Sequence, residues 1–297
     1  VSIGPDGADG LTYVRRPRER PLANKGYEGW VNINAAGEVS ITTGGKSEKF
    51  VLSGSTYVPL NGGSSKLTRP TFTTWVYEKG DGTQYKLFRD NVTDPSITLT
   101  GISEIKYPGG QKINLHWVQK IFTIACPQRP CPTTTRQRLS SITNSSSYQL
   151  KFSYAQNWGG ATAPSTGIPG WITLTKIQAI NNQIDACDPV ADTCTGFTRS
   201  WPQATYAQTN VGGVTTVNMV NDRGEAWRYT SSSTSAGIKP PSSASDTTTI
   251  TFSSGLVSAH TEGGITTSYS FVDASGVRTA TVTAPDSSTM IVKSAVP

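Results

Sequence analysis

Charged side chains are scarce in this sequence: Asp, Glu, Lys and Arg make up 15% of its 297 residues. Hydrophobic residues reach only 35%, and Ser, Thr and Gly fill much of the difference. A helical bundle needs more Ala, Leu, Glu and Lys than this. A disordered chain would have fewer aromatic residues than the 7 Trp, 11 Tyr and 8 Phe present. The composition is typical of short strands joined by many turns, and it predicts an all-β fold.

Long apolar runs and catalytic motifs are also missing. No apolar run approaches the roughly 20 residues that cross a bilayer, so we expect no membrane span. A Ser–His–Asp triad would need His116 or His260 as its base, and no G-x-S-x-G motif is present. His260 and Glu262 share one face of an expected strand, which would suit an acid–base or metal pair, but a solvent-facing hairpin is the strongly favoured interpretation. We therefore expect no enzyme activity, no catalytic residues, no metal and no cofactor.

Acidic residues are outnumbered, which gives a net charge of +6 and an isoelectric point near 9.1. The basic residues are dispersed except in the stretch "YVRRPRERP", which begins at Tyr13 and lies in an N-terminal basic arm, residues 1–24. Such an arm could bind nucleic acid or another anionic surface. No basic, aromatic-rich groove accompanies it, so we favour a solvated entry segment and expect no nucleic-acid partner.

The four cysteines form two close pairs in sequence. Cys126 and Cys131 bracket "CPQRPC", and Cys187 and Cys194 bracket "CDPVADTC". Pairing within each bracket is the most economical of three possible connectivities, and it would fasten the tips of two loops. Zinc binding is the alternative, but zinc fingers space their cysteines more tightly and add nearby histidines. We favour disulfides, which imply an oxidising compartment outside the cytoplasm.

Period-two alternation recurs along the chain and predicts hairpins. In "SSITNSSSYQLKFSY", residues 140–154, large apolar residues alternate with polar ones, and "SEIKYPGGQKINLHW", residues 103–117, does the same. Set 37 residues apart, the two stretches run in step, so that Gly110 aligns with Ser147. The stretch "TVTAPDSSTMIV" near the C-terminus follows the same pattern. Each hairpin is expected to have one apolar and one wetter face.

A lone hairpin is marginal in water, whereas stacked hairpins bury each other's edges in one continuous sheet. We expect residues 25–100 to form a β lead-in segment and residues 101–297 to form the hairpin repeats as one continuous sheet. Two stretches depart from the pattern, namely residues 155–170 and residues 231–247. Either could be a domain linker, but hairpins lie on both sides of each, so we favour long surface loops.

The hairpins "ISEIKYPGGQKINLHW", "RLSSITNSSSYQLKFSY" and "VTTVNMVNDRGEAWRYT" resemble RHS repeats, also called YD repeats, of bacterial RHS proteins and of related toxin-complex and teneurin shells. The segment "VNDRGEAWRYT", with Asp222, Gly224 and Tyr229, is the nearest match. The resemblance covers most of residues 25–297. It implies an extended, spiralling sheet of β-hairpins, which in complete family members closes into a hollow shell. The "DPxGxxG" cleavage signature of toxin-bearing members is absent, so no cleavage site is carried over.

We therefore expect a non-catalytic, secreted or cell-surface structural protein. Its partners would be copies of itself, or adjacent segments of a longer chain, that pair through edge strands. Two alternatives stay open: a carbohydrate-binding module of a secreted protein, and a shell fragment of a toxin-encapsulating RHS protein. Exposed Trp can stack on sugars, and Trp158, in the Gly/Pro-rich stretch, is the best candidate for a glycan or partner contact.

Overall fold

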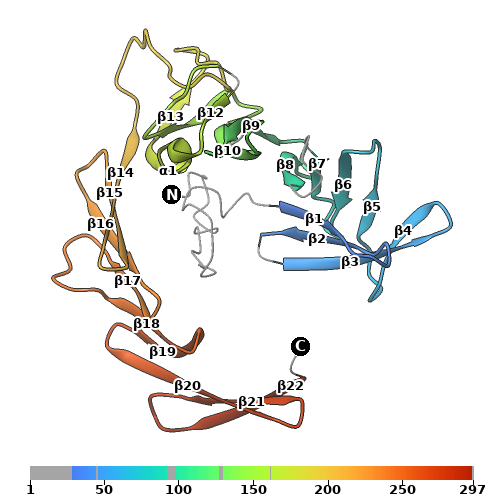
Figure 1. Cartoon of the computed structure of the whole chain (residues 1–297), viewed down its shortest axis with the longest axis vertical. Coiled ribbons are helices and arrows are strands. Elements are labelled where there is room, and N and C mark those ends of the chain that lie inside the picture. The colour runs from blue at the N-terminus through green and yellow to red at the C-terminus, as the bar shows by residue number, and fades with distance from the viewer. Residues whose placement is uncertain (1–28, 45, 92–97, 127–129, 161, 296–297) are drawn as a thin grey trace. The chain divides into compact units, whose positions relative to one another are not determined.

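The computed structural model describes residues 29–295 apart from 45, 92–97, 127–129 and 161, so the basic arm lies outside the described residues. Strands account for 60% of the structure and helices for 3%, arranged as successive antiparallel hairpins, which confirms the all-β prediction. The chain divides into two compact units (Figure 1). We call the described residues up to Gln203 unit 1 and those from Ala204 unit 2.

Unit 1 contains most of the strands and both helical turns. Its elements are β1 (Gly29–Ile33), β2 (Val39–Thr43), β3 (Lys46–Ser53), β4 (Thr56–Pro59), β5 (Lys66–Thr68), β6 (Thr74–Glu78), β7 (Gln84–Asn91), β8 (Thr98–Lys106), β9 (Lys112–Thr123), β10 (Thr133–Asn144), β11 (Tyr148–Tyr154), β12 (Thr162–Pro164), the 3-10 turn η2 (Ser165–Gly167), α1 (Ile168–Ile172) and β13 (Leu174–Asn181). Sequential strands pair antiparallel as far as β11, which then pairs with β13. The short strand β12 lies parallel to β9.

Unit 2 is a run of antiparallel strands in chain order, from β14 to β22 in Figure 1. The strands are β14 (Gln203–Val211), β15 (Val214–Asn221), β16 (Ala226–Ser231), β17 (Ser235–Lys239), β18 (Thr248–Ser253), β19 (Leu256–Glu262), β20 (Ile265–Ala274), β21 (Val277–Thr283) and β22 (Thr289–Ala295). Every strand pairs with the next one along the chain. Within its described residues, this unit consists of strands and turns alone.

One turn geometry recurs in hairpins of different sequence. Gly110 N–H donates to the Tyr107 carbonyl at 2.9 Å, Ser147 N–H to the Asn144 carbonyl at 3.2 Å, and Ser287 N–H to the Ala284 carbonyl at 2.9 Å. The donor residue has a positive φ each time: 84° at Gly110, 64° at Ser147 and 67° at Ser287. In each of these turns, the last residue has the left-handed backbone conformation. The alignment of Gly110 with Ser147 therefore identified equivalent backbone positions.

The core of unit 1 lies between strands that are not neighbours in the sheet. Phe50 and Trp75 are fully buried, and the edge of the Tyr57 ring meets Trp75 at 5.2 Å between centroids. Gly29 in β1 lies so close to β7 and β8 that a Cβ there would collide with Leu87 and Ile102. The first strands therefore pack onto later ones, and this packing buries side chains that a single layer would leave exposed.

The structure corrects two expectations about the middle of unit 1. The expected wetter face of β11 is buried, because Gln149 is 2% and Lys151 3% exposed, whereas Tyr148 is 55% exposed. The stretch 155–170 was expected to be a surface loop, but it contains β12 and η2 and leads into α1. The first difference arises because the segment after β13 covers β11, and the second because β12 pairs with the earlier strand β9. Among the described residues, no helix has the length and apolar character needed to cross a membrane.

Candidate functional site

The connection from β13 to β14, residues 182–202, contains the Cys187–Cys194 disulfide and lies on the polar side of β10 and β11. We call it the disulfide loop. Its main anchor is the carbonyl oxygen of Pro189, on which three donors converge: Ser141 Oγ at 2.7 Å, Ser140 Oγ at 2.9 Å and Lys151 Nζ at 3.1 Å. The loop thus supplies an acceptor to side chains that would otherwise be buried without one.

A break in strand register explains how two adjacent serines reach the same acceptor. Neighbours in a strand normally point to opposite faces. Between β9 and β10 the register shifts from Leu139 opposite Trp117 to Ser141 opposite His116, which leaves Ser140 as an extra residue. Such a bulge turns a side chain away from its usual side. It brings both hydroxyl groups under the disulfide loop.

Lys151 is the buried amine of this cluster. Its Nζ donates to Ser140 Oγ at 2.9 Å as well as to the Pro189 carbonyl. Burial lowers the pKa of Lys151 to about 8, a shift that the carboxylates of Asp188 and Asp192 partly oppose. Burial also lowers the pKa of His116, and the charge of Lys151 adds to that shift.

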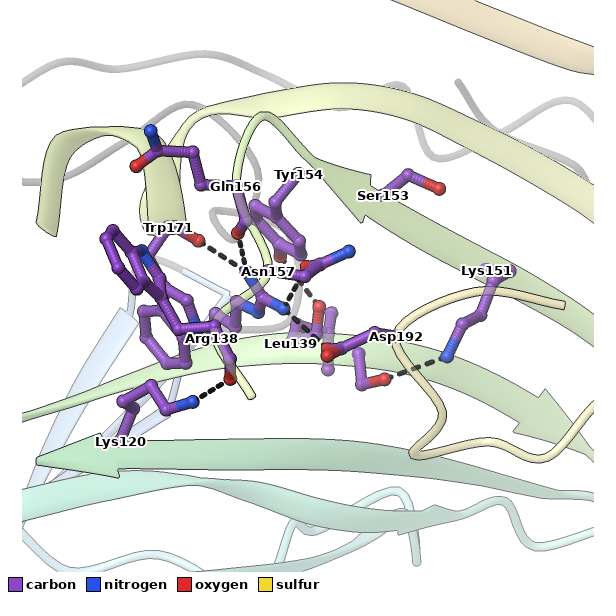
Figure 2. Close-up of polar contacts among 12 residues, drawn as sticks. Lys120, Arg138, Leu139, Lys151, Ser153, Tyr154, Gln156, Asn157, Trp171 and Asp192 are labelled. Atoms are coloured by element: carbon purple, nitrogen blue, oxygen red, sulfur yellow. Dashed lines mark hydrogen bonds and ion pairs between the residues drawn. The ribbon is translucent and has the colours of Figure 1, made fainter. Parts of the chain in front are cut away.

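Arg138 is the second buried cation, and Figure 2 shows it at the centre of the polar contacts. Its Nη1 donates to the Trp171 carbonyl at 2.8 Å and to the Gln156 carbonyl at 3.1 Å. Its Nη2 donates to Asn157 Oδ1 at 2.6 Å and forms an ion pair with Asp192 at 2.8 Å.

The same guanidinium lies over two aromatic rings, 4.4 Å from the Tyr154 centroid and 4.5 Å from the Trp171 centroid. Burial lowers the pKa of Arg138, against the opposing effect of Asp192. The planar fork of an arginine suits such a set of acceptors, which a lysine could not satisfy together. Arg138 therefore ties the segment after β11, the helix α1 and the disulfide loop to β10.

The two ends of the disulfide loop have their own contacts. Near its start, Asn182 Nδ2 donates to Gln149 Oε1 at 2.7 Å, and Gln149 Nε2 contacts Cys187 Sγ at 3.4 Å. Near its end, Trp201 Nε1 and Thr198 N–H donate to Asp185, at 2.8 and 2.9 Å. Hydrogen bonds therefore hold the loop near its start, at its middle and near its end, and the loop is an integral part of unit 1.

Ser140 and Lys151 lie at a distance that would suit a nucleophile and its base. However, both side chains donate to a carbonyl of the chain itself, that of Pro189. Among the described residues, no group of three or more His, Cys, Asp or Glu side chains could hold a metal ion. The arrangement that we observe binds an internal segment.

The sequence-predicted site residues lie in different places. The structure pairs Cys126 with Cys131 and Cys187 with Cys194, each with Cα atoms 5.5 Å apart, as the spacing favoured. His260 and Glu262 share one face of β19, and neither side chain is assigned a role.

Trp158 is half-buried and packs against the cluster of Phe122, Ala163 and Trp171. Lys120 Nζ donates to its carbonyl, and a Cβ at Gly167 would collide with its ring. The ring therefore contributes to the packing of unit 1. A glycan contact at Trp158 stays a prediction.

Sequence reasoning missed Arg138, Lys151 and the serines as a cluster. One signal was present: β10 is mostly polar, polar residues alternate on β11, and a Pro-containing cysteine loop follows. Such a loop can cover a polar face as well as end a hairpin. No protein-family model matches this chain, and no curated protein matches it at a significant level.

Proposed function

We propose that this chain is a non-catalytic structural protein of RHS/YD-like hairpin repeats, which extends its sheet by pairing with further strands. The observation that carries the proposal is the exposed edge at β22. Within the described part of the chain, β22 pairs with β21 alone. It carries Met290, Ile291 and Val292, which are 59%, 62% and 47% exposed.

An edge strand presents unpaired N–H and C=O groups, and natural proteins usually protect such edges with charges, proline or bulges. Lys293 is the one charged residue in β22. The pairing of β21 with β22 keeps one register, from Val277 opposite Ala295 to Thr283 opposite Thr289. An apolar, regular edge of this kind is suited to strand addition. The added strand would come from another copy or from an adjacent segment of a longer chain.

We place this function outside the cell. Two cysteine pairs at disulfide distance are compatible with an oxidising compartment. The cluster beneath the disulfide loop supports a structural role, because its polar groups are used to hold segments of the same chain together.

Light scattering after size-exclusion chromatography, over a wide concentration range, tests the proposal. Adjacent residues of an antiparallel edge strand direct their N–H groups to opposite sides. Of Ile291→Pro and Val292→Pro, one removes an outward donor and the other a donor to β21. We expect the variant that keeps the β signal in circular dichroism to lose self-association. A wild-type chain that stays monomeric alone, and also fails to bind a peptide of the sequence TMIVKSA, would refute the proposal.

A further inference from the structure

Unit 2 has very few residues that are shielded from solvent. Of the buried hydrophobic residues that the structure describes, three belong to this unit, namely Ala204, Val217 and Met219. All three lie in β14 and β15, so β16 to β22 contain no buried hydrophobic side chain among those whose burial is described. A sheet with one apolar face becomes stable by packing that face against another layer.

The two faces of this sheet differ in chemistry. Across β20, β21 and β22, the register aligns two rows of apolar side chains on one face: Tyr269, Val282 and Met290, and Phe271, Ala280 and Val292. At the other end of the unit, Tyr206, Met219 and Trp227 form a similar row, and Trp227 stacks with Tyr229 at 6.4 Å between centroids. Burial raises the pKa of Tyr206 to about 12, as expected for a phenol among apolar neighbours. We call this side the apolar face.

The opposite face carries hydroxyl groups. From β15 to β20, the register aligns six residues in a row on this face, and five of them are threonines: Thr216, Thr230, Gly237, Thr249, Thr261 and Thr266. Apolar residues on this side have polar cross-strand neighbours: Val272 lies beside Thr279, and Ile291 beside Thr281. Antiparallel sheets commonly have one packed and one solvated face. The hydroxyl face is suited to water, whereas the apolar face needs a cover.

We propose that the apolar face of unit 2 is covered by the same face of a second copy, so that two sheets form a sandwich. Nine strands at about 4.8 Å spacing, each contributing about 20 Å of length, give a face of roughly 850 Å². A stable interface needs about 800 Å² from each partner, so this face is large enough for a dimer.

The charges on the face favour an identical partner over a charged one. Asp273 and Arg278 lie on it as a bidentate ion pair, with distances of 2.7 and 2.8 Å, and so neutralise each other. The register also places His260 and Glu262 on this face, so one carboxylate of its strands has no opposite charge paired with it among the described contacts. A face with so little charge offers few contacts to a strongly acidic or basic ligand, whereas two copies can meet around a two-fold axis, which is the commonest symmetry of homodimers. This sandwich does not depend on the edge pairing proposed above, because it uses a face of the sheet and not its edge.

Two adjacent residues of β20 supply a matched test. Phe271→Lys places a charge on the apolar face, and Val272→Lys places the same charge on the hydroxyl face, at a side chain that is 63% exposed. We expect sedimentation velocity to show a wild-type dimer and an at least tenfold weaker dimer for Phe271→Lys, with Val272→Lys unchanged. Hydrogen exchange of β20 to β22 establishes that each variant is folded.

Cross-linking provides a second measurement that does not depend on stability. No described cysteine is free, so a new one would be the reactive thiol. β18 is the middle strand of the nine, and a two-fold axis through the sandwich passes near it. Ile250→Cys on the apolar face should cross-link to its copy with a short bismaleimide, and Thr251→Cys on the other face should not.

A wild-type monomer at every concentration would overturn the sandwich. So would a dimer that both lysine variants weaken equally, or cross-linking of both cysteine variants. A dimer that is lost only in the outward-facing proline variant of β22 would support edge pairing and reject the sandwich. Loss of the dimer in Phe271→Lys alone, with the proline variants still associating, would support the sandwich and reject edge pairing.

Discussion

Unit 1 and unit 2 are built from the same kind of hairpin, yet they bury their side chains very differently. In unit 1 the first strands pack over β7 and β8, α1 packs on β9, and the disulfide loop lies on β10 and β11. In unit 2 the sheet has no second layer among its described residues, and the side chains of β20 and β21 are exposed or half-buried. Hairpin pairing alone therefore makes a sheet, but the covering segments decide whether that sheet has a core.

Substitutions in the polar cluster of unit 1 should change the free energy of unfolding more than any others that we propose. Arg138→Met removes hydrogen bonds to two carbonyls that the fold keeps away from water, and we expect it to cost unit 1 about 3–4 kcal/mol. Arg136→Met, two residues away on an exposed side chain, should change stability by about 0.5 kcal/mol or less. Urea unfolding followed by tryptophan fluorescence measures both. Equal effects would show that Arg138 contributes no more than a surface charge.

Comparing the two disulfides separates two effects: the constraint that each places on the unfolded chain, and the cover that the disulfide loop alone gives to Lys151. Replacing either pair with serine relaxes the unfolded chain and should cost about 2–2.5 kcal/mol. Cys187→Ser with Cys194→Ser should cost more, because the loop also supplies the acceptor for Lys151. We expect this variant alone to expose Lys151 to acetylation, measured by mass spectrometry. If Lys151 stays protected, the hydrogen bonds hold the loop without the disulfide.

The pH dependence of stability tests whether Lys151 is buried as described. Its pKa is about 8 in the folded chain and 10.5 ordinarily, so between these values the unfolded chain binds more protons and stability rises with pH. The cost of keeping the amine buried is fully present below pH 8. We expect unit 1 to gain about 2 kcal/mol between pH 8 and 10. Burial raises the pKa of Tyr154, so unfolding becomes easier again once tyrosines of the unfolded chain ionise near pH 10.

Lys151→Met serves as the control, because it removes the titrating group and keeps the length of the side chain. Urea unfolding at a series of pH values should show a flatter profile for this variant. A wild-type profile as flat as that of Lys151→Met would mean that the amine reaches solvent.

The smallest expected effect concerns a turn shared by both units. Ser147 in unit 1 and Ser287 in unit 2 have φ values of 64° and 67°, a conformation that favours glycine. Ser147→Gly and Ser287→Gly should each stabilise their hairpin by up to about 1 kcal/mol. Ser270→Gly, within β20, should be destabilising instead. Hydrogen exchange of the flanking strands measures the local effect, and a loss of protection in either turn variant would contradict the assignment.

The sequence predicted the hairpins because their causes are local. Alternation of apolar and polar residues indicated the strands, and the alignment of Gly110 with Ser147 matched turns that share a left-handed residue. Cysteine spacing predicted the pairs that the structure contains. It could not predict that Lys151 is buried, because its burial depends on Pro189, which lies 38 residues further along the chain. A polar residue in an alternating strand looks the same whether water or another segment covers it.

By itself, then, the sequence determined the strands, the turns and the cysteine pairs, since each depends on neighbouring residues and on backbone geometry. The tertiary structure alone decided which faces are covered: it placed the disulfide loop over Arg138 and Lys151, and, within the described ranges, it left the apolar face of unit 2 without a second layer. The physical reason is that burial is a property of segments that meet in space, and alternation along one strand cannot specify what lies on either side of it.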